Sequence, residues 1–290
     1  MIGVILFVCV YIYSPNSVNS YVMTNYNDSV VRRVVYPLTS ASYGTTPELC
    51  LKDIFADGQL VRQYTVLCDR TQKHTCSGYL AYSTSAQAIF LVFRGSSSTE
   101  QVNEEFLETV TTFPISFPLG GRVNPYFFKA LQIILTSGLE QDLIYITKLL
   151  PGFSLWVSGH SLGAGLASLA AGHIAYKGYV PPSQITLITF GQPRTGNYVF
   201  AKTIDKVIPN TWRVTHRKDL VPVIVPLYAH HNREVWYNNS MAPGQPFVIC
   251  GTDDDQECVM SGSGHNWDDH SNYFNVDSYF AVNGCKNIPH

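Results

Sequence analysis

Apolar runs alternate with amphipathic stretches through the middle of the chain. Short, continuously apolar runs are typical of strands buried on both faces, and such strands are predicted at residues 88–93, 153–158, 184–190 and 211–216. Residues 126–150 repeat apolar side chains at helical spacing, and residues 162–176 are rich in alanine and leucine, as in a tightly packed helix. Alternating strands and helices predict an α/β domain with a mostly parallel sheet.

The composition narrows the class of protein. Charged residues make up 14% of the 290 residues and hydrophobic residues 46%, so a disordered or coiled-coil chain is excluded. The formal net charge of −2 gives no general attraction to nucleic acid. No apolar window after the N-terminus is long enough for a transmembrane span. Without repeats or a long linker, residues 21–290 are expected to form one domain, whose tail from residue 234 forms hairpins and loops over one end of the sheet.

The N-terminus begins with a short apolar run over residues 2–13. A run of this length fits the core of a signal peptide better than a membrane span. We therefore expect residues 1–20 to be a removed signal peptide, with small residues near Ser20 at the cleavage region, and the mature protein to be secreted. No lysine or arginine precedes the run, and the alternative is a buried first strand. Two sequons, at Asn27 and Asn238, are candidate glycosylation sites.

The cysteines agree with an oxidising compartment. One of the seven, Cys9, lies in the apolar run, and an even number remains once it is removed, as a disulfide framework requires. The remaining cysteines are Cys50, Cys68, Cys76, Cys250, Cys258 and Cys285. Short spacing favours the pairs Cys68–Cys76 and Cys250–Cys258, which would leave Cys50 to reach Cys285. A cysteine metal site is disfavoured because no C-x-x-C pair occurs.

A serine candidate lies between the second predicted strand and the alanine-rich helix. Gly159, Ser161 and Gly163 complete the pattern G-x-S-x-G. A turn this tight strains the serine backbone, and the flanking glycines allow neighbouring segments to approach. The turn presents the hydroxyl at the carboxyl end of the sheet, facing the first N–H groups of the helix from Leu162 onward. The alternative is a glycine-rich connection without chemistry.

A serine hydroxyl needs a general base and an orienting acid, and in this type of fold the acid follows the serine and the histidine comes last. Asp219 follows the strand at 211–216 and precedes an apolar run, so burial beside a partner is expected. The alternative is a solvated turn. The later histidines are His230, His231, His265, His270 and His290. Spacing favours His270, which has aromatic neighbours, over His265, which lies in a Gly/Ser loop. Spacing alone excludes neither histidine.

Several motifs together resemble the class 3 lipases, the fungal-type triacylglycerol lipases. The matching stretches, in chain order, are Phe-Arg-Gly-Ser-Ser at 93–97, the serine turn at 159–165, Phe-Gly-Gln-Pro-Arg-Thr-Gly-Asn at 190–197, Asp-Leu-Val-Pro at 219–222, and Asp269 and His270 with Tyr273 and Phe274. The ordered matches extend over residues 88–274. The resemblance implies an α/β-hydrolase fold with a mostly parallel sheet, flanking helices, a short lid helix and disulfides.

The same resemblance implies a reaction. Ser161 would attack an ester carbonyl, His270 would act as general base and then acid, and Asp219 would orient the imidazole. The backbone N–H groups of Ser96 and Leu162 would form the oxyanion hole. No metal or organic cofactor is required. The expected substrate is a lipid ester at a lipid–water interface, foremost an acylglycerol, and a monomer is assumed.

The family's lid segment differs here. Fungal relatives carry a tryptophan in the lid helix, where this chain has Val102. Val102, Phe106 and Val110 recur every four residues, with glutamates on another face. We interpret these three as the apolar side of a lid that meets lipid when it opens. The alternative is a surface helix that never moves.

Three other functions stay open at this point. The same triad could act on phospholipids or small soluble esters, since the shape of the acyl pocket decides between them. Metal-assisted hydrolysis could use the cluster His265, Asp268, Asp269 and His270, which lacks a defined ligand spacing. A non-catalytic extracellular lipid-binding domain is the third, although an intact serine, aspartate and histidine argue against it.

Overall fold

The computed structural model describes residues 23–68, 73–96, 112–224, 228–251, 258–261 and 263–286. The predicted signal peptide over residues 1–20 and the lid candidates Val102, Phe106 and Val110 lie outside these residues, as does His290. In the described part of the chain, no helix has both the length and the apolar character needed to cross a membrane.

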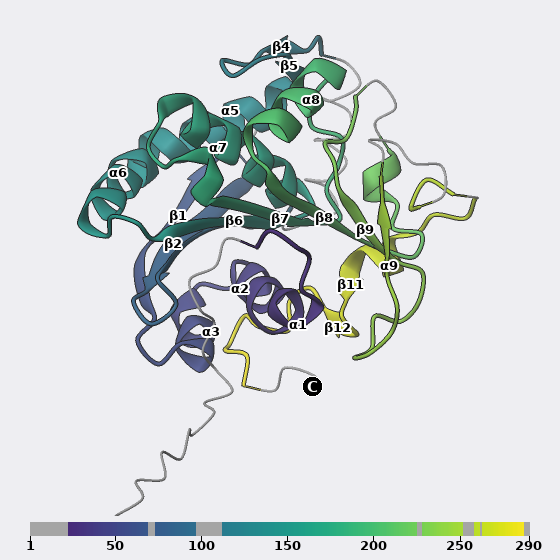
Figure 1. Cartoon of the computed structure of the whole chain (residues 1–290), viewed down its shortest axis with the longest axis horizontal. Helices are drawn as coiled ribbons and strands as arrows, with labels where there is room; N and C mark the ends of the chain where they lie inside the picture. The colour runs from purple at the N-terminus through teal and green to yellow at the C-terminus, as the bar shows by residue number, and fades with distance from the viewer. Residues whose placement is uncertain are drawn as a thin grey trace, which may run out of the picture.

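Among the described residues, an eight-stranded sheet runs through the centre of the molecule in the order β1-β2-β3-β6-β7-β8-β9-β10 (Figure 1). Strands β3, β6, β7, β8 and β9 pair in parallel, and β1, β2 and β10 pair antiparallel at the two ends. The strand bounds are β1 Gln59–Leu67, β2 Thr75–Ser83, β3 Ala88–Phe93, β6 Ser154–His160, β7 Ile185–Phe190, β8 Asn210–His216, β9 Glu234–Tyr237 and β10 Val248–Cys250. The predicted α/β class is confirmed.

Helices cover both faces of this sheet (Figure 1). One face carries α1 (Asp28–Val30), the π-helical turn η1 (Val31–Val35), α2 (Tyr36–Ala41) and α3 (Pro47–Ile54). The other carries α5 (Pro125–Ile134), the π-helical turn η2 (Leu135–Leu139), α6 (Glu140–Leu149), α7 (Leu162–Lys177) and α8 (Tyr198–Val207). Shorter elements are β4 (Ile115–Ser116), β5 (Arg122–Val123), η3 (Pro182–Gln184), η4 (Val221–Val223), α9 (Trp267–Ser271), β11 (Asn272–Tyr273) and β12 (Val276–Asp277).

Two hydrophobic layers of different composition pack against the sheet. Alternation along β6 sends Leu155 and Val157 to one face and Trp156 to the other. The aliphatic layer lies under α5 to α8 and is built largely of leucine, isoleucine and alanine, including Leu131, Leu166, Leu169, Ala170, Leu187 and Ile204. The aromatic layer lies under the N-terminal helices and the C-terminal segment and includes Tyr36, Tyr79, Phe90, Trp156, Phe190, Trp212, Tyr237, Tyr273 and Phe274.

Two predictions about local structure were wrong. The continuous helix over 126–150 is broken, because Gly138 has a φ of 117°, outside the helical region, and separates α5 from α6. The tail from residue 234 contains more than hairpins and loops. Strand β9 extends the parallel sheet beside β8, and α9 follows later in the tail.

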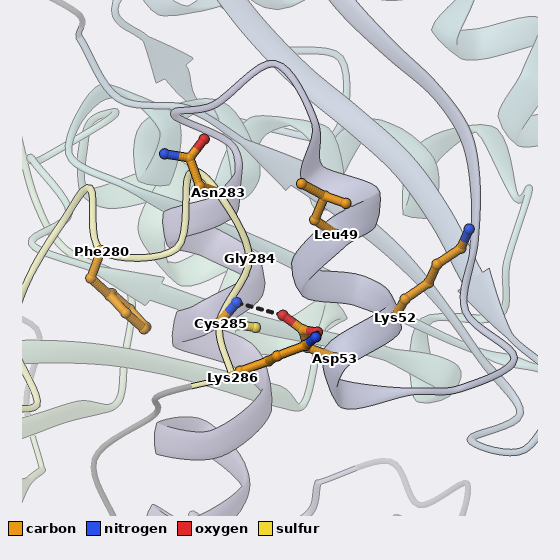
Figure 2. Close-up of a pocket in the computed structure, with 8 residues that line it drawn as sticks. All are labelled: Leu49, Lys52, Asp53, Phe280, Asn283, Gly284, Cys285 and Lys286. Atoms are coloured by element: carbon orange, nitrogen blue, oxygen red, sulfur yellow. Dashed lines mark hydrogen bonds and ion pairs between the residues drawn. The ribbon is translucent and has the colours of Figure 1, made fainter.

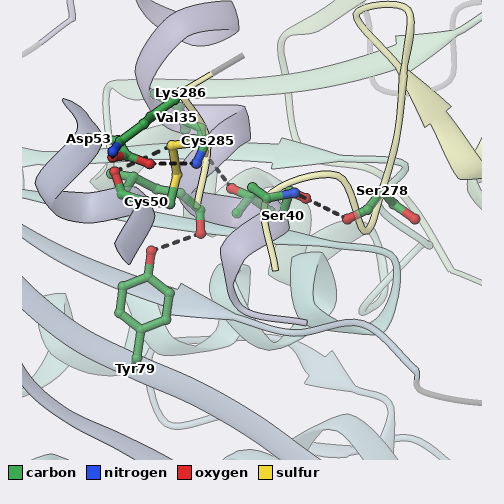
Figure 3. Close-up of a disulfide and its surroundings, with 11 residues drawn as sticks. Val35, Ser40, Cys50, Asp53, Tyr79, Ser278, Cys285 and Lys286 are labelled. Carbon is green, nitrogen blue, oxygen red and sulfur yellow. Dashed lines mark hydrogen bonds and ion pairs between the residues drawn. A yellow bond between two sulfur atoms is a disulfide. The ribbon is translucent and has the colours of Figure 1, made fainter. Parts of the chain in front are cut away.

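The three disulfides join Cys50 to Cys285, Cys68 to Cys76 and Cys250 to Cys258, which are the pairs named from the sequence. The first connects α3 to the C-terminal segment, within the aromatic layer's helical cover (Figure 3). Beside it the Cys285 N–H donates to an Asp53 oxygen at 2.7 Å, at the edge of an open pocket that Lys52 and Phe280 also line (Figure 2). The disulfide thereby joins the N-terminal helices to the segment around residue 285.

Both sequon asparagines lie at the surface. Asn27 is exposed, and its side-chain oxygen accepts a hydrogen bond from the Val30 N–H as the N-cap of α1. Asn238 is exposed directly after β9. Glycosylation at these two positions stays a prediction.

Candidate active site

Ser161 occupies the turn between β6 and α7. Its backbone has a φ of 57° and a ψ of −128°, a conformation that is rare for a residue with a side chain. The Ser161 N–H donates to the carbonyl oxygen of Phe190, and the Ser161 carbonyl accepts from the Ala164 N–H at 2.9 Å. A methyl group on Gly163 would overlap the carbonyl oxygen of Phe93. Only glycine at this position allows the strand that ends in Phe93 to approach the start of α7.

Asp219 and His270 form a buried pair. Asp219 follows β8 and is fully buried, and His270 lies on the short helix α9 with 6% of its surface exposed. The His270 Nδ1–H donates to the Asp219 carboxylate, at 2.9 Å from Oδ1 and 3.0 Å from Oδ2. Because a carboxylate only accepts, this contact places a proton on Nδ1, so Nε2 is the ring nitrogen that can take up or release the second proton.

Further donors surround the Asp219 carboxylate. The Tyr273 hydroxyl donates to Oδ2 at 2.6 Å, and the Val221 N–H donates to Oδ1 at 2.9 Å. Burial by itself would raise the pKa of Asp219. The charge of His270 and the hydrogen bonds outweigh burial and hold the pKa of this carboxyl below its ordinary value. Asp219 therefore stays a carboxylate, which can orient and stabilise an imidazolium.

The end of β7 brings these three residues together. Phe190 accepts the Ser161 N–H at 3.0 Å. A methyl group on the next residue, Gly191, would lie 2.7 Å from Asp219 Oδ2 and 2.8 Å from both Nδ1 and Cε1 of His270. Two consecutive residues thus contact the serine turn and the acid–base pair. The three candidates, which are far apart in sequence, meet at the carboxyl edge of the parallel strands.

The loop after β3 lies against the serine. A methyl group on Gly95 would sit 3.1 Å from Ser161 Cβ and 2.9 Å from the His160 carbonyl oxygen. Ser96 follows this contact and is half-buried, and Leu162, at the start of α7, is 2% exposed. The two backbone segments named for an oxyanion hole therefore flank the same serine.

The other histidine candidates have different partners. His230 Nε2 pairs with the Pro222 carbonyl at 2.9 Å, and His265 Nε2 with the Val259 carbonyl at 2.8 Å. His231 Nε2–H donates to Gln192 Oε1 at 3.1 Å. These histidines tie loops together rather than facing Ser161. Within the described ranges no three His, Cys, Asp or Glu side chains are grouped as a metal site requires; of the proposed metal cluster, His265 and His270 face different partners.

Sequence reasoning missed two residues beside the pair. The Tyr43 hydroxyl lies 2.7 Å from His160 Nδ1, and His160 Nε2 lies 2.9 Å from the carbonyl oxygen of His270. The rings of His160 and His270 stack with centroids 4.5 Å apart. His160 is the variable residue directly before the serine in the G-x-S-x-G pattern. This position beside the serine was the one feature of the sequence that could have drawn attention to His160. Nothing local marks Tyr43, because its partner is distant in sequence.

Known proteins resemble this chain in sequence and in fold. A sequence model of the lipase (class 3) family matches residues 90–229. A protein of Caenorhabditis elegans named as a lipase is 30% identical over 305 residues, covering 90% of this chain and 83% of that protein. The chain belongs to the class 3 lipases. It is a carboxylic ester hydrolase of the triacylglycerol lipase type.

Other relatives of this class 3 lipase match over shorter stretches. The secreted mono- and diacylglycerol lipase A of Penicillium camembertii is 33% identical over 165 residues, covering 55% of this chain and 51% of that protein. The chain thus spans about half the length of this fungal relative. Lipase II from Rhizopus niveus superposes with a TM-score of 0.75 over 87% of this chain and 97% of that structure, at 22% identity. This structural likeness shows the shared α/β-hydrolase fold.

Proposed function

We propose that this class 3 lipase is a secreted serine hydrolase that cleaves acylglycerol esters with the triad Ser161, Asp219 and His270. The observation that carries the proposal is the buried Asp219–His270 pair, in which Asp219 holds Nδ1 and leaves Nε2 as the nitrogen that can exchange a proton, near a strained serine turn. A weak hydroxyl nucleophile needs such a base, and the base needs such an acid.

The proposed reaction proceeds through an acyl-enzyme. Ser161 Oγ bonds to the ester carbonyl carbon while its proton passes to His270 Nε2. The negative charge on the carbonyl oxygen is met by the N–H groups of Ser96 and Leu162. The bond to the alcohol then breaks, and the alcohol leaves with the proton held by His270. Water repeats the sequence on the acyl carbon, which releases the carboxylic acid and restores the serine.

A lipid substrate is supported by the surface around this edge of the sheet. Phe113 is 91% exposed before β4, and Tyr198 and Val199 are 62% and 55% exposed at the start of α8. Arg122 and Asn197 join the two segments, since the Arg122 N–H donates to Asn197 Oδ1 at 3.0 Å and the Asn197 N–H to the Arg122 carbonyl at 2.8 Å. Exposed apolar side chains on joined segments of this kind can contribute to a surface that meets lipid.

The segment before Asn197 also packs against the first turn of the helix that follows the serine. The segment before Asn197 contains Thr195, whose Oγ1 lies 3.5 Å from a methyl group built on Gly165, one turn into α7. Acylglycerol is the substrate class named for the Penicillium relative. Secretion is supported by the N-terminal apolar run and by the three disulfides, which persist in oxidising compartments.

The test uses the purified full chain and Ser161→Ala. Wild type is expected to hydrolyse p-nitrophenyl butyrate and emulsified tributyrin, and the variant to lose about 10⁴-fold or more in rate. A fluorophosphonate probe should label wild type at Ser161, as read by peptide mass spectrometry. Ser168→Ala is the matched control, because Ser168 lies on the same helix, is fully buried and only donates to the Gly165 carbonyl.

Four outcomes would overturn all or part of the proposal. Retained activity in Ser161→Ala, or labelling at another residue, would remove the triad. Failure of wild type on every ester would favour a non-catalytic lipid-binding domain. Hydrolysis of the soluble ester without the emulsified triglyceride would keep the triad and reject the acylglycerol substrate.

A further inference from the structure

His160 is a buried titratable residue that the proposed reaction does not use. It is the last residue of β6, directly before Ser161, and only 3% of its surface is exposed. A buried imidazole normally faces partners that fix its tautomer. Both ring nitrogens of His160 have such a partner. One of the two partners is the backbone carbonyl of His270, the proposed base.

The hydrogen bonds of His160 have a defined direction. The His270 carbonyl oxygen can only accept, so His160 Nε2, at 2.9 Å, carries the proton. Burial, with the nearby charge of His270, lowers the pKa of His160 to about 3, so the ring is neutral. Nδ1 is then an acceptor, and the Tyr43 hydroxyl donates to it at 2.7 Å. Tyr43 therefore selects the tautomer in which His160 holds the His270 backbone.

The two imidazoles are also held ring to ring. Their planes differ by 26° and their centroids are 4.5 Å apart. Trp267 lies near His270 with a centroid distance of 5.7 Å, at a steep angle. His160 thus restrains both the carbonyl and the ring of the base. Because His160 is bonded covalently to Ser161, its contacts with His270 also restrain the position of the base relative to the nucleophile.

Tyr43 connects this arrangement to a second part of the site. It follows α2, and its ring packs on Tyr279 at a centroid distance of 4.5 Å. A methyl group on Gly95 would overlap the Tyr43 hydroxyl oxygen. The hydroxyl therefore lies between the loop that precedes Ser96 and the ring of His160.

We propose that Tyr43 and His160 are positioning residues that set the distance and angle between His270 and Ser161. The proposal rests on the triad of the proposed function. Neither residue touches the substrate or exchanges a proton with it. Tyr43 keeps His160 in the tautomer that donates to His270, and His160 holds the base over the residue next to it in sequence.

The experiment compares kcat and KM on a soluble ester for wild type, Tyr43→Phe, His160→Gln and the double variant. Tyr43→Phe keeps the ring against Tyr279 and loses only the hydroxyl. We expect kcat to fall about tenfold with KM unchanged, since a slightly misplaced base weakens the transition state more than substrate binding. His160→Gln keeps an amide N–H for the His270 carbonyl and loses the ring, and we expect a fall of ~10–100-fold.

The double variant separates positioning from a general loss of packing. If the Tyr43 hydroxyl acts through His160, adding Tyr43→Phe to His160→Gln should change kcat by less than about twofold. Tyr79→Phe is the matched control, because the Tyr79 hydroxyl is buried in the aromatic layer, near the Cys50–Cys285 disulfide (Figure 3), and donates at 2.7 Å to the Leu38 carbonyl rather than to a residue of the site. It should lower Tm at least as much as Tyr43→Phe and leave kcat near wild type.

Three results would overturn the positioning role: wild-type kcat in Tyr43→Phe, a full multiplicative loss in the double variant, or an equal fall of kcat in Tyr79→Phe. Fluorophosphonate labelling of Ser161 in wild type is measured in parallel. Labelled, active wild type with unaffected variants rejects the positioning role alone, whereas inactive, unlabelled wild type rejects the triad on which it rests.

Discussion

The two layers that pack against the sheet differ in chemistry as well as in shape. The aliphatic layer under α5 to α8 is built largely of side chains that only fill space, such as Leu131, Leu166 and Ala170. The aromatic layer contains rings with polar tips, and the hydroxyl of Tyr273 reaches the Asp219 carboxylate at 2.6 Å. One layer fixes the helix that begins after Ser161, and the other supports Asp219 and His270, the proposed acid and base.

This difference separates stability from activity. An aliphatic side chain acts through the area that it buries and the cavity that it would leave. A tyrosine in the aromatic layer also directs a hydrogen bond, so its removal changes the geometry of a particular partner. Substitutions in the aliphatic layer should therefore change mainly the free energy of unfolding, and those in the aromatic layer whose hydrogen bonds reach Asp219 or His270 should also change kcat.

The largest expected effect follows from Asp219→Asn. The amide keeps the shape of the carboxylate and removes the charge that stabilises the imidazolium, so kcat should fall ~10³–10⁴-fold on a soluble ester. Asp205→Asn on α8 is the control, since Asp205 accepts a loop N–H, from Asn232, and pairs with Lys202. More than half of wild-type kcat in Asp219→Asn would contradict the assignment of the acid.

Leu131→Ala tests the expectation that a substitution in the aliphatic layer changes stability rather than kcat. Leu131 is fully buried on α5, and the cavity should lower the free energy of unfolding by ~2–5 kcal/mol. Denaturant unfolding measures the loss, and kcat of the folded variant should stay near wild type. A large fall of kcat with an unchanged free energy of unfolding would contradict the proposed difference between the layers.

Tyr273→Phe provides the corresponding test in the aromatic layer. The ring keeps its packing against Phe190, 5.9 Å between centroids, while Asp219 loses one buried donor. We expect kcat to fall about tenfold, with a loss of unfolding free energy of about 1–2 kcal/mol, smaller than for Leu131→Ala. Equal activity to wild type would show that the remaining donors to Asp219 suffice.

The smallest expected effect is on stability in mild acid. The folded pKa of His160 is lowered to about 3 from the ordinary 6.5, so between these values the unfolded chain binds a proton that the folded chain does not. Stability therefore decreases as the pH falls from about 6.5 toward 3, by about 1 kcal/mol for His160 between pH 6 and pH 5.

This acid effect is measured as a difference between proteins. His230 and His231 are also buried with lowered pKa values and act with the same sign. The lowered pKa of Asp219 acts in a more acidic window, because its contribution is present above the ordinary value of 3.8 and lost as pH falls through the folded pKa. Denaturant unfolding at pH 6 and pH 5 should show a shallower decrease for His160→Gln than for wild type, and parallel decreases would contradict it.

The sequence predicted the parts of the fold whose signals are local. Strand β3 is six apolar residues buried along its whole length, and the turn at Ser161 has glycines where the backbone must approach other segments. The N-terminal helices were not predicted, because their burial depends on the distant Tyr273 and Phe274 rather than on a local pattern. The helix break at Gly138 depends on one dihedral angle, which periodicity does not encode.

The candidate site likewise contains residues that a local pattern marks and residues that only distant contacts identify. Ser161 is marked by its own turn, and Asp219 by an isolated charge beside an apolar run. His270 needed the family resemblance, since several later histidines fit the spacing and only tertiary contacts distinguish them. The hydrogen bond from Tyr43 to His160 links residues 117 positions apart, so no motif could have indicated it.

The disulfide between Cys50 and Cys285 bears on how the protein matures. It joins residues separated by 235 positions, and of Tyr43 and His270 only His270 lies between them, since Tyr43 precedes Cys50. During synthesis the serine turn emerges long before the histidine that would activate it. In the proposed triad, Ser161 therefore precedes its base on the nascent chain, and the three residues can come together only after residue 270 has left the ribosome.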